Sequence, residues 1–218
     1  MLIHALIPMR KGSIRVKNKN FIKINKKQLY LYSVEQVVKS KYISKVFIST
    51  NENKKKFIFK NKKLEIIGRS KTSSTKHAPT EILIEEFLKK YYCDYIVLVQ
   101  VTTPFIKAKY IDLAIEKMIH NKKKYDSLVS TVKSKYMMWR KKGKLIYPHN
   151  FRPKTRPRSQ DIKDREYIEN GCFYIFRRNN FFKHKFRSHG KMTFFEMPKH
   201  TAVELDEKED LEIIRKFI

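Results

Sequence analysis

Positively charged side chains gather directly after the first apolar run of the chain, in the segment MRKGSIRVKNKN at residues 9–20. Its cations are Arg10, Lys11, Arg15, Lys17 and Lys19. Gly12 and Ser13 stand where the loop is expected to bend, and backbone N–H groups there can hold a polyphosphate together with Arg10 and Lys19. Neither GxxxxGK[ST] nor GxGxxG is present, so this is not one of the common phosphate-binding loops. A solvated basic loop is the alternative.

Two carboxylates, Glu204 and Asp206, stand two residues apart in the segment VELDEKEDL. If that segment is the end of a strand, both side chains face one side. Two hard oxygen ligands suit Mg²⁺, which takes phosphate oxygens and water as its other ligands. The alternative is that Asp206 caps a closing helix and Glu209 completes a capping box. Both interpretations can hold, because a cap and a ligand can use different oxygens.

Two more segments place polar groups beside apolar runs. Gln100 ends the strongest strand pattern, DYIVLVQ, and its side chain can hydrogen-bond a ligand there. The alternative is that this segment and the TTP near it form only a proline-terminated turn with threonine helix caps. Asn170-Gly171 is a strong signal for a two-residue hairpin. Here it lies inside an apolar strand pattern, where glycine indicates a bulge or the close approach of a ligand. Both interpretations stay open.

Short apolar runs alternate with helical patterns, which predicts an α/β fold with a mostly parallel sheet. The expected strands are residues 2–8, 45–50, 64–68, 94–100, 127–132, 167–177 and 192–198. The expected helices are 28–40, one opened by Pro79, 108–120 and 206–218, and 51–61 is a basic helix or loop. In such sheets ligands bind on loops at the carboxyl ends of the strands, where residues 9–20 and 100–105 fall.

The length of 218 residues and the hydrophobic content of 41% suit one domain with a real core, which we expect to span residues 1–218. From about residue 135 to 165 the alternation stops. That stretch is basic and holds Trp139, Tyr147 and several prolines. We expect an inserted hairpin or arm there.

Cys93 and Cys172 are the two cysteines, and both lie in apolar patterns, so we expect buried free thiols. Residues 1–8 do not have the features of a signal peptide, and no run approaches the roughly 20 apolar residues of a membrane span. We therefore expect a cytoplasmic protein with no membrane partner.

The formal net charge is +29, which first suggests a nucleic-acid partner. However, the sequence contains no DNA- or RNA-binding signature, and its aromatic residues follow core-like strand patterns. An AT-rich genome would also enrich lysine, asparagine and isoleucine. We therefore expect no nucleic-acid partner, and a non-catalytic basic nucleic-acid-binding protein remains the alternative from another class.

Taken together, the motifs resemble the acylneuraminate cytidylyltransferase (CMP-sialic acid synthetase) family. That family has IPARxxSKxxxxKN, LxQPTSP, Pro-Arg-x-Gln, Asn-Gly-x-x-Tyr-Ile and DIDxxxDL, in this order. The corresponding segments here are IPMRKGS with Lys19-Asn20, LVQVTTP at 98–104, PRSQ at 157–160, NGCFYI at 170–175 and ELDEKEDL at 204–211. The order and spacing agree over nearly the whole chain.

The resemblance implies a three-layer αβα Rossmann-like fold of the nucleotide-diphosphosugar transferase type. It implies transfer of CMP from CTP to a nonulosonic, sialic-acid-like 2-keto sugar acid, with Mg²⁺ as cofactor, in a homodimer whose arm reaches the partner's site. The implied nucleotide-binding residues are Arg10, Gly12, Ser13, Arg15, Lys19, Asn20, Arg69 and Thr80. The implied sugar-acid ligands are Gln100, Thr102, Arg158, Gln160 and Asn170, and the implied metal ligands are Glu204 and Asp206. Arg10, Lys19 and Asp206 are the implied catalytic residues.

Some positions depart from the family pattern. Ile14 stands where lysine is usual, with Arg15 beside it, and Glu204 stands where aspartate is usual. Val101, Ile106 and Lys76-His77 replace a proline, an arginine and an aspartate. The alternatives are a cytidylyltransferase for 3-deoxy-manno-octulosonate, pseudaminic or legionaminic acid, or an inactive relative that acts as a binding partner.

Overall fold

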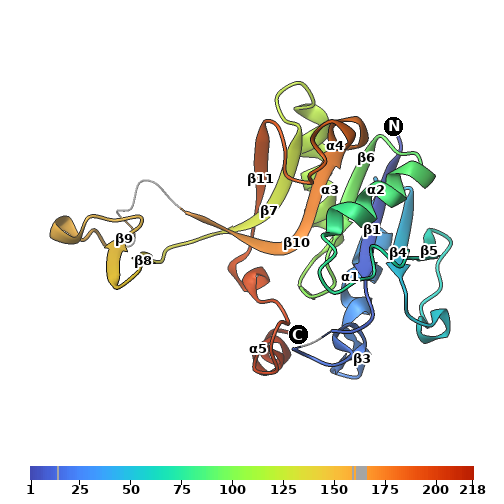
Figure 1. Ribbon diagram of the computed structural model, residues 1–218, viewed down its shortest axis with the longest axis horizontal. Helices are drawn as coiled ribbons and strands as arrows, with labels where there is room; N and C mark the ends of the chain where they lie inside the picture. Colours follow the sequence, from blue (N-terminus) through green and yellow to red (C-terminus); the bar gives the residue numbers. More distant parts are fainter. Residues whose placement is uncertain (14, 159, 161–165) are drawn as a thin grey trace.

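The computed structural model describes residues 1–13, 15–158, 160 and 166–218. A seven-stranded sheet forms its centre, in the order β11-β7-β10-β6-β1-β4-β5 (Figure 1). These strands are β1 (Ile3–Met9), β4 (Lys45–Thr50), β5 (Leu64–Gly68), β6 (Tyr95–Val99), β7 (Ser127–Lys133), β10 (Tyr167–Arg177) and β11 (Met192–Met197). Neighbours pair in parallel, except that β10 is antiparallel to both β6 and β7.

Helices cover both faces of the sheet because its strands are apolar on both sides. In β1, Ile3 and Ile7 join the core with helices α1 (Leu29–Lys39) and α3 (Ala108–His120). Leu6, which points to the opposite face, joins the core with α2 (Thr80–Lys90) and α4 (Arg178–His184). The arrangement is a three-layer αβα fold of Rossmann type, so the predicted fold class is confirmed.

The last helix, α5 (Asp210–Phe217), belongs to a third and smaller apolar cluster. Its Ile214 packs there with Leu205 and Phe105, two residues of the loops around the candidate site. The helix predicted at 206–218 thus begins at Asp210, four residues later than expected. The segment around Glu204 is extended but is not a strand, so the predicted strand end is wrong in that respect.

Residues 135–158 leave the sheet and carry the antiparallel hairpin of β8 (Trp139–Lys142) and β9 (Leu145–Pro148). Gly143, at φ +60°, makes the two-residue turn together with Lys144. Figure 1 shows this arm projecting far from the sheet. Ser159 and residues 161–165 of the predicted arm, like Ile14 of the first loop, lie outside the described residues.

Both cysteines are buried and free, as predicted, and burial raises the pKa of the Cys93 thiol to about 12. A second small hairpin joins β2 (Lys23–Ile24) to β3 (Lys27–Gln28) ahead of α1. Within the part of the chain that the structure describes, no helix has the length and apolar character needed to cross a membrane.

Candidate active site

A cavity of about 410 Å³ lies where the loops after β1 and β6 meet. Eight of its lining residues were predicted as site residues: Arg10, Ser13, Arg15, Lys19, Asn20, Gln100, Thr102 and Asp206. An adjoining cavity of about 150 Å³ shares Asn20, Gln100 and Thr102 with it and adds Thr80, the first residue of α2. The structure thus brings together residues as far apart in the sequence as Arg10 and Asp206.

The cationic loop is held at a few points, and three of its cations, Arg10, Arg15 and Lys19, line the cavity. Gly12 has φ +88°, a conformation that favours glycine. The N–H of Lys11 donates to the Asn51 side-chain oxygen at 2.7 Å, and Val16 is buried. Asn51 was not predicted as a residue of this region, although it directly follows the strand expected at 45–50, where ligand-binding loops begin.

Asp206 is the acceptor for two cations of that loop. Lys19 Nζ lies 2.8 Å from Asp206 Oδ1, and Arg15 Nη2 lies 3.2 Å from Oδ2. The Lys19 side chain is only 15% exposed, so its pair is partly shielded, whereas Arg15 is a surface partner. The bond from Lys19 is the main cause that lowers the pKa of Asp206.

The capping alternative for Asp206 is wrong. Glu209 precedes α5 and makes no side-chain cap. Instead, the Asp210 carboxylate accepts hydrogen bonds from the N–H groups of Asp206 and Glu207, each at 2.7 Å. This reversed arrangement leaves the Asp206 side chain free to face the cavity.

Glu204 lies beside Asp206, as the alternation predicted. The residue between them, Leu205, is fully buried, and its N–H donates to the Thr102 carbonyl at 2.9 Å. Thr102 Oγ1 donates to Glu204 Oε2 at 3.4 Å. Burial, followed by the nearby Asp206 carboxylate, raises the pKa of Glu204. The pKa values of Glu204 and Asp206 are therefore shifted in opposite directions.

These two carboxylates form a donor set that suits a hard cation such as Mg²⁺. The residues that the structure describes contain no group of three or more His, Cys, Asp and Glu side chains that could hold a metal ion. A cation bound to Glu204 and Asp206 would therefore need oxygens from a substrate or water. That requirement suits Mg²⁺ sites that act on phosphates.

Arg69 follows β5 and comes close to Arg10. Its Nε donates to the Ser73 carbonyl at 2.8 Å. Burial, followed by the charge of Arg10, lowers the pKa of Arg69. Among the described residues no carboxylate forms an ion pair with either guanidinium, so their charge can serve an anion.

The structure places three predicted ligands elsewhere. Arg158 and Gln160 are exposed, and neither lines the two cavities of its own chain. Asn170 is buried and its Nδ2 donates to Thr201 Oγ1 at 2.9 Å. In the Asn170-Gly171 pair the bulge interpretation is confirmed and the hairpin interpretation is wrong, because Gly171 lies within β10 at a break in its pairing with β7.

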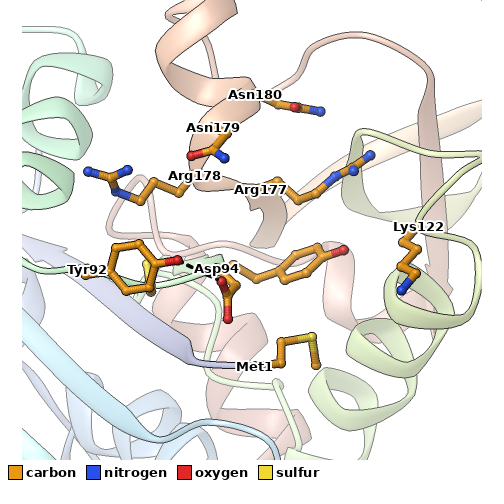
Figure 2. Close-up of a pocket in the computed structure, with 10 residues that line it drawn as sticks. Met1, Tyr92, Asp94, Lys122, Arg177, Arg178, Asn179 and Asn180 are labelled. Carbon is orange, nitrogen blue, oxygen red and sulfur yellow. Dashed lines mark hydrogen bonds between the residues drawn. The ribbon is translucent and has the colours of Figure 1, made fainter.

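A second cavity, of about 430 Å³, lies at the amino ends of β1 and β6 (Figure 2). It contains none of the predicted residues, and many of its polar groups bind one another. Asp94 accepts hydrogen bonds from the Leu2 N–H and the Tyr92 hydroxyl, and Arg178 lies over the Tyr92 ring. These contacts hold the amino end of the sheet together.

A family model described as cytidylyltransferase matches residues 4–217. The chain belongs to the cytidylyltransferase family. It is 28% identical over 209 residues to N-acylneuraminate cytidylyltransferase A of Danio rerio, covering 94% of this chain and 48% of that protein. It is 24% identical over 225 residues to a pseudaminic acid cytidylyltransferase of Campylobacter jejuni, covering 97% and 94% respectively.

The chain spans about half the length of the N-acylneuraminate cytidylyltransferases that it matches. Among solved structures it resembles CMP:2-keto-3-deoxy-manno-octonic acid synthetase complexed with CTP, with a TM-score of 0.71 and 15% identity. That match covers 100% of this chain and 98% of the other. The likeness supports the fold assignment.

Proposed function

We propose that this protein transfers CMP from CTP to the anomeric hydroxyl of a nonulosonic 2-keto sugar acid and releases pyrophosphate. The main support is the cavity in which the cationic loop of residues 10–20 meets the carboxylate of Asp206, with the carboxylate of Glu204 close to Asp206. Family membership supports the reaction class. The relatives include an N-acylneuraminate and a pseudaminic acid cytidylyltransferase, which supports an acidic sugar of this kind.

In the reaction the sugar hydroxyl oxygen forms a bond to the α-phosphorus, and the bond from that phosphorus to the leaving pyrophosphate breaks. The hydroxyl proton is released. Such chemistry depends mainly on positioning and on stabilisation of charge. Arg10, Arg15 and Lys19 bind the β- and γ-phosphates with the N–H groups near Gly12 and Ser13, and Asn20, Arg69 and Thr80 contact the nucleotide.

Glu204 and Asp206 would hold Mg²⁺. Bound there, the ion supplies positive charge for the α-phosphate as its negative charge grows. In the nucleotide-free chain Lys19 Nζ lies 2.8 Å from Asp206 Oδ1, so a cation proposed to bind the triphosphate lies directly beside a proposed metal ligand.

Gln100 and Thr102 are proposed to bind the sugar acid, since both line the main cavity. Arg158 and Gln160 would reach it from the arm of a second copy in a homodimer, with Arg158 as the cation for the sugar carboxylate. The exposed apolar residues Trp139, Leu145 and Ile146 on the arm support such a partner. Asn170 contributes from behind the site, by fixing the backbone of β10. The two free cysteines support a cytoplasmic location.

The test is a screen for pyrophosphate release in which CTP, UTP and ATP are each combined with several 2-keto sugar acids. We expect release with CTP and a nonulosonic acid, and none with ATP. The 3-deoxy-manno-octulosonate, pseudaminic and legionaminic acid arms decide among the alternative substrates. No release with any pair would refute the proposal.

A further inference from the structure

Strand β10 contains a large break directly beside the candidate site. Its pairing with β7 runs to Glu169, opposite Thr131, and resumes at Tyr174, opposite Val129. The four residues of β10 from 170 to 173 therefore stand against one residue of β7, Ser130. Bulges of this kind re-aim a strand next to functional sites.

The break has its own set of hydrogen bonds. The Asn170 side chain donates to Thr201 and accepts from the Cys172 N–H, and the backbone carbonyl of Asn170 accepts from Thr103 Oγ1 at 3.3 Å. Ser130 Oγ accepts from the Phe173 N–H at 2.9 Å. These hydrogen bonds thus fix a backbone path that the pairing with β7 does not fix.

Gly171 lies inside this fixed path, has φ +61° and is buried. A Cβ atom built on Gly171 would lie 2.7 Å from Cδ of Glu204 and 2.8 Å from its Oε2. Real Cβ atoms essentially never come so close to another atom. The carboxylate of Glu204 therefore rests on the bare backbone of Gly171.

Glu204 has few other contacts that set its position. Thr102 donates one hydrogen bond of 3.4 Å to it, and the backbone of Leu205 is fixed by its bond to the Thr102 carbonyl. The space left by the missing side chain of Gly171 is thus a main determinant of where this carboxylate can lie.

We propose that Gly171 is a positioning residue, whose bulged backbone provides the space that sets the Glu204 carboxylate at the distance needed to share a cation with Asp206. The inference rests on the proposed function through the metal-binding role of Glu204. It also explains how this chain accommodates a glutamate, with one methylene more than aspartate, at that position.

The test is Mn²⁺ binding, followed by EPR of the free ion, in the presence of a CTP analogue with an α,β-methylene bridge. We expect Gly171→Ala to weaken Mn²⁺ binding by about 10-fold to 100-fold, the size found for residues that orient metal ligands. In the double variant Gly171→Ala/Glu204→Asp the shorter side chain withdraws from the added methyl group. Most of the lost affinity should return.

Gly190→Ala is the matched control. Gly190 has φ +62°, and a Cβ built on it would lie 2.8 Å from Cγ of Asp126, a carboxylate outside the cavity. We expect both Gly190→Ala and Gly171→Ala to lower the melting temperature, but we expect Gly190→Ala to leave the Mn²⁺ affinity unchanged. Gly171→Asn is the second variant, because asparagine tolerates left-handed backbone and so retains the clash at a lower backbone cost.

Wild-type Mn²⁺ affinity in Gly171→Ala or Gly171→Asn overturns the inference and leaves the proposed function intact. A double variant that binds no better than Gly171→Ala also overturns it, because a purely structural role predicts no rescue. Unchanged Mn²⁺ binding in Glu204→Gln overturns the metal role of Glu204 itself, and the inference with it.

Discussion

Asp206 joins two segments that are far apart in the sequence, because its carboxylate oxygens form ion pairs with Lys19 and Arg15 of the first loop. In the proposed reaction those cations bind the triphosphate instead. Nucleotide binding would then withdraw two positive charges from Asp206 and leave its carboxylate available to a cation. The ion pairs of the nucleotide-free chain and the contacts of the loaded site are alternatives.

Asp206→Ala should lower CTP-dependent pyrophosphate release by about 100-fold or more, the cost of losing one transition-state-stabilising group. The fold should persist, because the Asp206 ion pairs among the described residues are with Arg15 and Lys19 of the first loop and not with the core. Pyrophosphate assays and circular dichroism measure the two effects. Near-normal turnover would contradict the metal role of Asp206.

Arg10→Ala should weaken CTP binding by about tenfold, because it removes a hydrogen-bonding cation from the phosphate loop. Isothermal titration with CTP measures the change. Lys11→Ala is the control, since Lys11 is exposed, belongs to the same loop and does not line the cavity. Equal losses in both variants would mean that the loop acts only through its overall charge.

Glu204→Gln should stabilise the folded chain at neutral pH. The pKa of Glu204 is raised, mainly by burial, so its charged form is disfavoured in the folded state. As pH falls through that raised pKa the wild-type group becomes neutral, and the advantage of glutamine should shrink. Melting temperatures of both proteins over a pH series measure this. If the melting-temperature advantage of Glu204→Gln grew as pH falls, the raised pKa of Glu204 would be refuted.

At the scale of elements, hydrophobic periodicity was sufficient for most of the fold. Residues 45–50, 64–68, 108–120 and 167–177 have the predicted bounds. Helix α4 was missed because seven residues directly after a strand are too few to show a helical period. The start of α5 was missed because it depends on the Asp210 side chain, which binds two N–H groups ahead of the helix.

The site was predictable where its residues follow a strand, as Arg10 and Gln100 do. It was not predictable where long-range pairing decides the local structure. Asn170-Gly171 forms a bulge because the segments flanking it pair with β7 and β6 rather than with each other. Spacing alone placed Glu204 and Asp206 on one side, yet the segment is held by Thr102 and not by a sheet.

Ile146→Asp on the arm should separate a homodimer into monomers, because Ile146 is 63% exposed on a projecting hairpin and would be covered by the partner. Sedimentation velocity measures the mass. We expect CTP binding to persist and turnover to fall, since Arg158 and Gln160 would no longer reach a second copy. Ile58→Asp, at a position 67% exposed outside the arm, is the control. A monomeric wild-type protein would rule out this arrangement.

For the whole molecule, the charge of +29 far exceeds what one nucleotide site needs. The cations that line the cavity are Arg10, Arg15 and Lys19. Exposed charges act weakly at a distance, because salt screens them within about 10 Å. The excess charge is therefore poor evidence about function.

Replacing Lys122, Lys123 and Lys124 with glutamine should leave the KM for CTP within about twofold of wild type, because these exposed residues precede β7 and none lines the main cavity. Steady-state kinetics at low salt measure it. A nucleic-acid-binding protein would instead lose affinity for DNA or RNA in this variant, with a shallower salt dependence. Such a loss, without any CTP-dependent activity, would favour that alternative.

The place of β10 between β6 and β7 has a consequence for synthesis on the ribosome. Residues 95–99 and 127–133 emerge long before residues 167–177, so β6 and β7 are both made before the strand that joins them. Until β10 is made, each of these strands has an unpaired edge, which is the kind of surface that pairs with wrong partners. The cationic loop lacks its partner Asp206 for longer still, until residue 206 has emerged. We expect the nascent chain to need chaperone protection until residues 167–177 have emerged, and to acquire affinity for nucleotide only after residue 206 has emerged.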